Sequence, residues 1–291
     1  MMYSLDQVRS AIRDPKLVIE LLNRKIWHYK SGVPYNANGI NIFDEDWDNL
    51  IILDACRYDS FANQVNLEGS LDSRESRGAM SEEFIRGNFH DRQLHDVVYV
   101  SANHWFSKIN EEINAEVFKY LPTVDDGPDG LTTLPQTVTA VALEQARNHP
   151  DKRLIIHYMQ PHKPFLGPTG RELDYEKGVD LDRIGVDSET IRQAYHENLD
   201  LVLEEVESLL PELKGKTVIT ADHGEMLGER ERPIPIRSFG HPKGVHVEPL
   251  ISVPWFVCDY EERKEIVRET PVGNDVVEDV DERLKNLGYK I

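Results

Sequence analysis

The chain has 291 residues, of which 40% are hydrophobic and 29% are charged, which excludes fibrous and largely disordered classes and allows one main globular domain. Asp and Glu number 52 against 33 Lys and Arg, and the formal net charge of −19 argues against nucleic acid as a partner, because it would repel a phosphate backbone. Two cysteines are too few for the disulfide framework of a small secreted domain, so a reducing compartment fits.

The N-terminal segment is predicted to be helical. Between Leu5 and Trp27 apolar residues recur at helical spacing, and Pro15 divides the segment into two short helices. We interpret residues 1–45 as a helical extension in front of a main domain at 46–291. The extension is locally basic, and it either packs on its own domain or makes peripheral contact with an anionic membrane. The sequence shows no signal-peptide pattern and no apolar run that spans a bilayer, so we expect a cytoplasmic protein.

Short apolar runs that end in polar turns predict the strands of a central sheet. These runs are NLIILD from Asn49, VVYVSA from Val97, RLIIHYM from Arg153, KTVITAD from Lys216 and LISVPWFV from Leu250. Helical patterns lie between them, from about Pro135 to Arg147 and from about Ser188 to Leu210, and a last helix contains Val280 and Leu284.

This alternation predicts an α/β fold, a three-layer α/β/α sandwich with a mostly parallel central sheet. Ligands of such sheets gather at the carboxyl ends of the strands. The segments Leu121–Gly130 and Phe165–Asp187 are rich in Gly, Pro and Asp and are predicted to be surface loops, where we expect substrate selection.

Candidate metal ligands follow two of the predicted strands. Asp222 and His223 stand side by side where KTVITA ends, and Asp54 ends the NLIIL strand in the same way. A carboxylate oxygen and an imidazole nitrogen suit Zn²⁺ or Mn²⁺, and Gly224 lets the backbone turn without crowding an ion. The competing interpretations are a helix-capping carboxylate for Asp54 and a hydrogen-bonded loop histidine for His223.

Four motifs in the same order resemble those of the alkaline phosphatase and sulfatase superfamily. LDACRYD resembles the opening metal-binding motif of sulfatase-like proteins, and TADHGEMLGE resembles their late Asp-His-Gly-Glu motif. HYMQPHKPF is similar to the mid-chain His-Pro segment, and GHPKGVHVEPLISVPW to the final histidine followed by a Val-Pro strand. The resemblance covers about Asn49 to Val257 and implies an alkaline-phosphatase-like fold for the catalytic domain.

The resemblance also implies a ligand set. Asp54, Asp222 and His223 would bind one divalent ion, while His162 and His241 would face the substrate or a second ion, so one or two metals are expected. His241 matches the final histidine better than His246, which we interpret as a structural or surface residue. We interpret His157 as packed or hydrogen-bonded rather than as a ligand.

The nucleophile is expected at the amino end of a helix, where backbone N–H groups stabilise an oxyanion. Ser81 stands directly before the helical run that starts at Glu82, with Gly78 nearby, and an ordinary serine N-cap is the alternative. Ser76 is the second candidate. The string that formylglycine sulfatases require, Cys or Ser, one residue, Pro and a nearby Arg, is absent, so a serine that attacks phosphorus is favoured.

Other polar residues near these motifs receive supporting roles. Arg57 and Arg77 are candidates for clamping a tetrahedral anion. Cys56 is interpreted as a small buried residue, and Glu225 as a residue that orients His223 or a bound water.

The sequence thus predicts a metal-dependent hydrolase of phosphate or sulfate esters that works through Ser81 and a covalent intermediate, with His162 assisting catalysis. The substrate would be a small-molecule, glycan or lipid ester, with phosphomonoesters ahead of phosphodiesters and sulfates. Two alternatives are a phospho-head-group transferase acting on a glycan or lipid, and a catalytically silent metal-binding homologue. A doubly wound nucleotide-binding module is disfavoured, because no Gly-rich phosphate loop follows the first strand.

Overall fold

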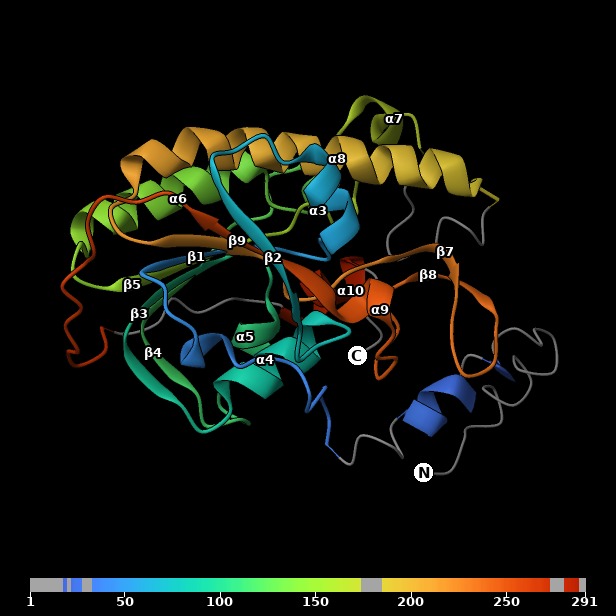
Figure 1. The fold of residues 1–291 in the computed structure, drawn as a ribbon, viewed down its shortest axis with the longest axis horizontal. Coiled ribbons are helices and arrows are strands. Elements are labelled where there is room, and N and C mark those ends of the chain that lie inside the picture. Colours follow the sequence, from blue (N-terminus) through green and yellow to red (C-terminus); the bar gives the residue numbers. More distant parts are fainter. Residues whose placement is uncertain (1–17, 20–21, 28–32, 174–184, 273–279, 288–291) are drawn as a thin grey trace.

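The architecture is that of a seven-stranded sheet between two layers of helices, seen in a computed structural model that describes residues 18–19, 22–27, 33–173, 185–272 and 280–287 (Figure 1). The sheet strands are β1 (Asn49–Leu53), β2 (Gly69–Glu75), β3 (Gln93–Ser101), β4 (Glu116–Pro122), β5 (Arg153–Tyr158), β6 (Thr217–Thr220) and β9 (Ser252–Cys258). The short strands β7 (Met226–Arg230) and β8 (Arg237–Gly240) pair as a separate hairpin.

The strand order is β2-β9-β6-β1-β5-β3-β4, which puts β1 at the centre. β6, β1, β5, β3 and β4 pair in parallel, and β9 is antiparallel to both of its neighbours. All residues of β1 are buried, as expected for a parallel strand that is covered on both faces. The predicted α/β/α class with a mostly parallel sheet is confirmed.

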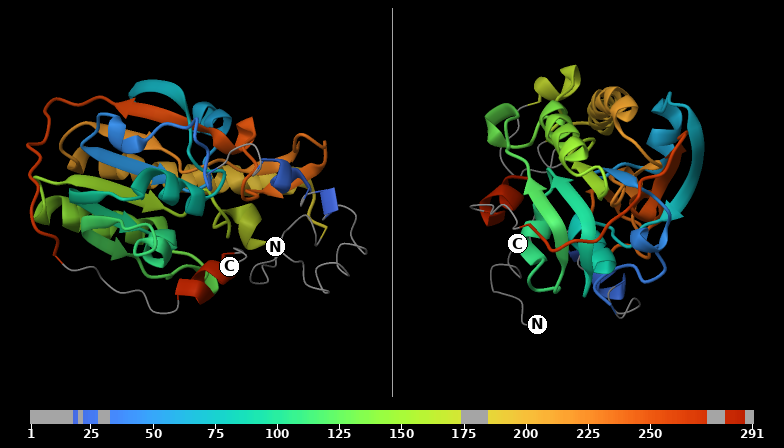
Figure 2. Two further views of the ribbon diagram at one scale, coloured as in Figure 1. Left: turned by 90° about the horizontal axis from the view of Figure 1, so that it is seen from below. Right: turned by 90° about the vertical axis from the view of Figure 1, so that its left-hand side faces the viewer.

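Two groups of helices cover the two faces of the sheet, as the views in Figures 1 and 2 show. One layer holds α3 (Tyr58–Gln64), α6 (Pro135–Asn148) and α8 (Ser188–Leu209), and the other holds α4 (Ser81–Phe89) and α5 (Trp105–Ile109). The short helices are η1 (Ile42–Asp44), η2 (Pro128–Gly130), α7 (Pro168–Arg171), η3 (Leu210–Glu212), α9 (Glu248–Ile251) and α10 (Val280–Asn286). α6 and α8 agree with the predicted helices to within a residue at each end.

β2, β4, β7 and β8 were not predicted from the sequence. β2 is mostly exposed and polar, and β4 alternates only in part, so neither shows the continuous apolar run used to find the central strands. These strands lie at the two edges of the sheet or in the separate hairpin, where burial is incomplete.

A chain segment after β9 returns along the amino-terminal ends of the strands. In this segment Val267 N donates to Asp151 O at 3.0 Å and Val272 N donates to Phe118 O at 2.9 Å. The ammonium of Lys152, whose side chain is almost fully buried, bridges Asp151 and Glu269. These contacts hold the segment after β9 against the end of the sheet where the parallel strands begin.

Only part of the predicted helical extension lies within the described residues. Residues 18–19 and 22–27 are helical and pack on the segment between β7 and β8, where Asn23 Nδ2 donates to Glu231 Oε2 at 2.9 Å and Trp27 Nε1 to Arg232 O at 2.7 Å. The predicted boundary at residue 45 and the peripheral membrane contact stay predictions. Among the described helices, none has both the length and the apolar character needed to cross a membrane.

Candidate active site

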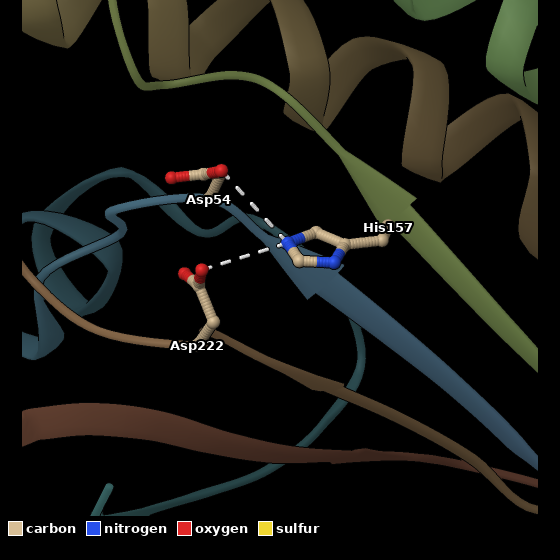
Figure 3. A group of neighbouring side chains, drawn as sticks. All are labelled: Asp54, His157 and Asp222. Atoms are coloured by element: carbon tan, nitrogen blue, oxygen red, sulfur yellow. Dashed lines mark ion pairs between the residues drawn. The ribbon is translucent and has the colours of Figure 1, made fainter. Parts of the chain in front are cut away.

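Three buried polar side chains meet at the carboxyl ends of the central strands. Asp54 follows β1, His157 lies near the end of β5, and Asp222 follows β6, with ligand atoms all within 4.8 Å of one another (Figure 3). His157 Nε2 lies 4.0 Å from Asp54 Oδ2 and 3.7 Å from Asp222 Oδ2. The register explains the meeting, because Ile52 of β1 pairs with both His157 of β5 and Thr220 of β6.

His223 adds a fourth donor to this cluster. Its Nε2 lies 3.6 Å from Asp54 Oδ1 and 3.4 Å from Asp222 Oδ2, and its side chain is fully buried. The other ring nitrogen, Nδ1, hydrogen-bonds Gly224 O at 2.8 Å, which makes Nδ1 the donor and leaves Nε2 unprotonated on the side of the carboxylates. This is the tautomer that a metal-binding histidine needs.

The chemistry of these donors fits a divalent cation. Within the described part of the chain, Asp54 Oδ1, Asp222 Oδ2 and His157 Nε2 are buried without a hydrogen-bond partner. Such buried polar atoms are costly unless a partner is present. Burial, and next the negative charge of Asp222, raise the pKa of Asp54 well above its usual value. A cation between the two carboxylates would offset both the cost of burial and the repulsion between their charges.

Burial and the neighbouring histidines shift the pKa of Asp222 in opposite directions. Burial raises its pKa, but positive charge on the imidazoles of His223 and His157 in their protonated forms outweighs this and lowers the pKa of Asp222, and a bound cation would act in the same direction. Asp222 is therefore the carboxylate of the pair that stays ionised, and its negative charge can hold a cation.

Ser81 lies directly beside this cluster. Its Oγ is 3.3 Å from His223 Nε2 and accepts a hydrogen bond of 2.9 Å from Asn103 Nδ2. The same amide nitrogen donates to Asp54 Oδ2 at 2.6 Å, so Asn103 links the nucleophile candidate to the cluster. Asn103 is itself fixed, since its Oδ1 accepts from Trp105 N at 3.0 Å.

The helix-cap alternative for Ser81 is wrong. Met80 is the N-cap residue of α4, and Ser81 is the first helical residue, with a fully buried side chain that faces Asn103 and His223. Ser76, the second candidate, instead donates its hydroxyl to Asp222 O and accepts from Gly78 N at 3.1 Å. Ser76 thus supports the turn that carries Asp222. The helix-cap alternative for Asp54 is also wrong, because Arg57 is the N-cap residue of α3.

His162 and His241 border the same centre. The ring of His241 lies 4.6 Å from that of His223 and 5.0 Å from that of His162, measured between centroids. Burial, and next the neighbouring His241, lower the pKa of His162 to about 3, so this imidazole is neutral near pH 7. Five of the six predicted site residues are nine-tenths or more buried, and His241 is nearly so.

The prediction for Glu225 needs a correction. Its Oε2 pairs with His241 Nδ1 at 2.8 Å, whereas His223 is oriented by the carbonyl of Gly224. Glu225 therefore orients His241. Gly224 is also required for packing, because a Cβ there would lie 2.1 Å from Pro249 O.

The two arginines predicted as anion clamps are engaged elsewhere. Arg57 pairs with Asp59 at 2.6 Å and with Glu229 at 2.7 Å, and Arg77 donates to the carbonyls of Gly39 and Gly87. Cys56 is buried as predicted, and burial raises the pKa of its thiol well above the usual value.

Asn103 and His157 are the site residues that sequence reasoning missed. Both follow the rule that was used for Asp54 and Asp222, because they stand at the carboxyl ends of β3 and β5. His157 is hydrogen-bonded as expected, through Nδ1 to the hydroxyl of Tyr99 at 2.9 Å, yet its Nε2 belongs to the candidate metal cluster.

Comparison with known proteins was made by sequence and by structure. No protein-family model and no curated protein matches the chain. The C-terminal periplasmic domain of EcEptC from Escherichia coli, in complex with Zn, is similar with a TM-score of 0.51 at 11% identity, over 73% of this chain and 72% of that one. The same domain of phosphoethanolamine transferase EptC from Campylobacter jejuni gives 0.48 at 13% identity, over 72% and 77%. A 2-O GAG sulfatase gives 0.48 at 12% identity, over 84% and 70%.

At such low identity the similarity is one of fold. The chain shares its fold with the EcEptC domain, and the α/β/α fold that the four sequence motifs imply is observed. A shared fold does not by itself define the reaction, so the function has to be argued from the site.

Proposed function

We propose that this chain is a metal-dependent hydrolase of phosphate esters that acts through Ser81 and a covalent phosphoserine. The observation that carries the proposal is the position of Ser81 Oγ, at 2.9 Å from Asn103 Nδ2 and 3.3 Å from His223 Nε2, beside a buried cluster of carboxylates and imidazoles. The Ser81 hydroxyl is fully buried at the start of a helix. Packing alone would not require polar neighbours around it.

Asp54, Asp222 and His223 are the residues that would hold a divalent ion, and His157 stands where a further ligand would lie. Zn²⁺ or Mn²⁺ suits this mixture of oxygen and nitrogen donors. When bound, the ion would supply positive charge that favours the Ser81 alkoxide and neutralises the oxygens of the phosphate.

In the first half of the reaction Ser81 gives its proton to water, and Oγ attacks phosphorus. The bond between phosphorus and the ester oxygen breaks, and the departing oxygen keeps the electron pair and takes up a proton. His241, whose Nδ1 pairs with Glu225, would give that proton from Nε2. The Asn103 amide donates to the Ser81 oxygen, and the backbone N–H groups of the first turn of α4 would stabilise the negative oxygens of the phosphate.

In the second half, water attacks the phosphoserine, the Ser81 oxygen leaves with its electron pair and regains a proton, and phosphate is released. If the substrate is a phosphodiester and the head group stays on phosphorus in the intermediate, attack by an acceptor hydroxyl in place of water transfers the phospho-head-group to that hydroxyl. The Campylobacter jejuni domain is named for such a transfer, that of phosphoethanolamine. The two activities share Ser81 and differ in substrate and acceptor, so one experiment with both ester types can separate them.

The test is release of nitrophenol from phosphate monoester, phosphate diester and sulfate ester by metal-free protein, with Zn²⁺ or Mn²⁺ restored. We expect metal-dependent turnover of a phosphate ester and a phosphate adduct on the peptide that contains Ser81, detected by mass spectrometry after acid quenching. Burst release of nitrophenol with slow turnover that glycerol or a glycoside accelerates would favour transfer. A protein that binds the metal but forms no adduct and releases no nitrophenol would contradict the proposal.

A further inference from the structure

The loop His241–Val247, between β8 and α9, carries His241 to the candidate active site. Gly244 in this loop adopts a φ of +77°, and the backbone closes a short turn in which Val245 N donates to Pro242 O at 3.3 Å. Such a loop has few backbone contacts of its own to define where His241 lies. Its position therefore depends on what it touches.

Glu83 makes polar contacts to this loop, whose Val245 also packs in a buried apolar cluster with Ala79, Met226 and Leu250. Its carboxylate, only 2% exposed, accepts from Gly244 N at 2.7 Å and from His246 Nε2 at 3.1 Å. It also accepts from Ala79 N at 2.9 Å, in the turn that leads into Ser81. One buried carboxylate thus joins the turn before the nucleophile, the helix α4 and the loop that carries His241.

The neighbouring carboxylate of Glu82 contacts the same loop in a weaker way. It pairs with Lys243, whose side chain is 50% exposed, and with Arg86 on its own helix. Ion pairs with a solvent-exposed partner contribute little, because water screens the charges and the long side chain loses entropy. Glu83 instead accepts hydrogen bonds from two backbone amides, one buried and one partly buried, and loss of these would leave the donors without partners.

We propose that Glu83 is a positioning residue, which holds the His241 loop against the start of α4 and so sets the place of His241 relative to Ser81. Its effect on catalysis rests on the proposed function, in which His241 protonates the leaving oxygen. The contact of the Trp27 ring with His246, at 6.2 Å between centroids, extends the same anchor to the N-terminal helix.

The anchoring is tested without substrate, by amide hydrogen exchange of Gly244 in Glu83→Gln and in the matched control Glu82→Gln. Both variants remove one negative charge from the same helical turn, but only Glu83→Gln can turn an N–H₂ group toward backbone N–H donors, those of Ala79 and Gly244. We expect exchange at Gly244 to accelerate at least about tenfold in Glu83→Gln and to match the wild type in Glu82→Gln. Unchanged exchange in Glu83→Gln would overturn the proposal.

If Glu83→Gln does not fold, His246→Ala carries the test, because it removes one of the loop contacts and leaves the carboxylate in place. We then expect a smaller acceleration at Gly244 in the same direction. Exchange equal to the wild type in this variant would overturn the anchoring.

The consequence for His241 is tested by a double-mutant cycle on ester hydrolysis. A small displacement of a catalytic group costs on the order of 100-fold, so Glu83→Gln should lower kcat/KM by about 10- to 100-fold. In a His241→Ala background the same change should lower it less than about twofold, since its effect passes through His241. Effects that multiply would overturn the positioning role. A wild type without turnover would contradict the proposed function, while the exchange result would still decide the anchoring.

Discussion

At the scale of single residues, the candidate active site consists of side chains that would be costly to bury for packing alone. Asp54, Asp222 and His157 each place a polar atom in the interior without a hydrogen-bond partner in the described part of the chain. Burial of such groups destabilises a fold unless a ligand compensates for it. The site is therefore better understood as a place for a cation than as a structural network.

Ser81 and Ser76 should separate cleanly in mutagenesis. Ser81→Ala removes the proposed nucleophile and should lower turnover at least about 1000-fold while it leaves the fold intact. Ser76→Ala leaves Gly78 N and Asp222 O without their partner, so we expect a loss of about 1–3 kcal/mol in the free energy of unfolding. Turnover assays and urea denaturation of both variants test this, and a Ser81→Ala enzyme with normal turnover would contradict it.

His157 should contribute to metal affinity. His157→Gln keeps a polar side chain but removes the Nε2 atom that lies 3.7 Å from Asp222 Oδ2, so Zn²⁺ affinity should fall at least about tenfold. Isothermal titration of metal-free protein measures it, with His95→Gln as control, because His95 pairs with Glu116 away from the site. Equal affinities in the two variants would mean that His157 only hydrogen-bonds Tyr99.

At the scale of elements, the sheet is organised by contacts at both ends of its strands. At the carboxyl ends, parallel register brings the site residues together. At the amino ends, Asp48 joins three segments, because its carboxylate accepts from Lys216 N before β6 at 2.8 Å and from Arg263 Nε at 2.7 Å in the segment after β9. A Cβ on Gly215, whose φ is +92°, would lie 2.6 Å from the same carboxylate.

Asp48→Asn should destabilise the protein in a pH-dependent way. Burial raises the pKa of Asp48, but the hydrogen bond from Arg263 and the backbone amides outweigh it, so the pKa lies below the usual 3.8. The stabilisation is thus present above pH 3.8 and is lost as the pH falls through the lower folded-state pKa. At pH 7 we expect a loss of about 1–3 kcal/mol, measured by urea denaturation.

The matched control for this prediction is Asp46→Asn. Asp46 pairs with the same Arg263, but its side chain is 63% exposed, so the change should cost less than about 1 kcal/mol. Equal losses in the free energy of unfolding for the two variants at pH 7 would contradict this prediction. A difference between the variants that persists below the folded-state pKa of Asp48 would contradict it as well.

At the scale of the whole molecule, a ligand at the carboxyl ends of β1, β5 and β6 would tie together the centre of the sheet. An ion that binds only the folded chain stabilises it by mass action. At a Zn²⁺ concentration about 1000 times the Kd, the gain is about 4 kcal/mol. For a chain of this size we expect the melting temperature to rise by several degrees.

Scanning calorimetry with Zn²⁺ and then with excess chelator measures this shift, and Asp222→Asn should abolish most of it. A shift of the same size in Asp222→Asn would place the ion elsewhere on this acidic chain. No shift in the wild type would argue against a metal at the candidate site.

Most of the sheet could be predicted from the sequence, because a strand that is buried on both faces, parallel or antiparallel, needs a continuous apolar run. That requirement revealed β1, β3, β5, β6 and β9. The edge strand β2 could not be found in this way, since its exposed side chains do not have to be apolar. Asp54, Asp222 and His223 could be predicted because they follow strands directly and match known motifs. Asn103 matches no motif that we recognised. His157 is the first residue of the His-Pro segment HYMQPHKPF, a pattern that does not distinguish a ligand from a packed residue, so only its spatial neighbours reveal its place in the site.

The sequence by itself determined the class of fold, the strands that bear the site, and the carboxylates and imidazoles suited to a metal, because burial and strand ends leave a local signature. The tertiary structure decided which of them meet. It joined Ser81 to Asn103 and His223, assigned Glu225 to His241, and placed His157 beside both carboxylates. These pairings depend on register between strands and on loop packing, and both are set by contacts between residues far apart in the chain, which no local pattern records.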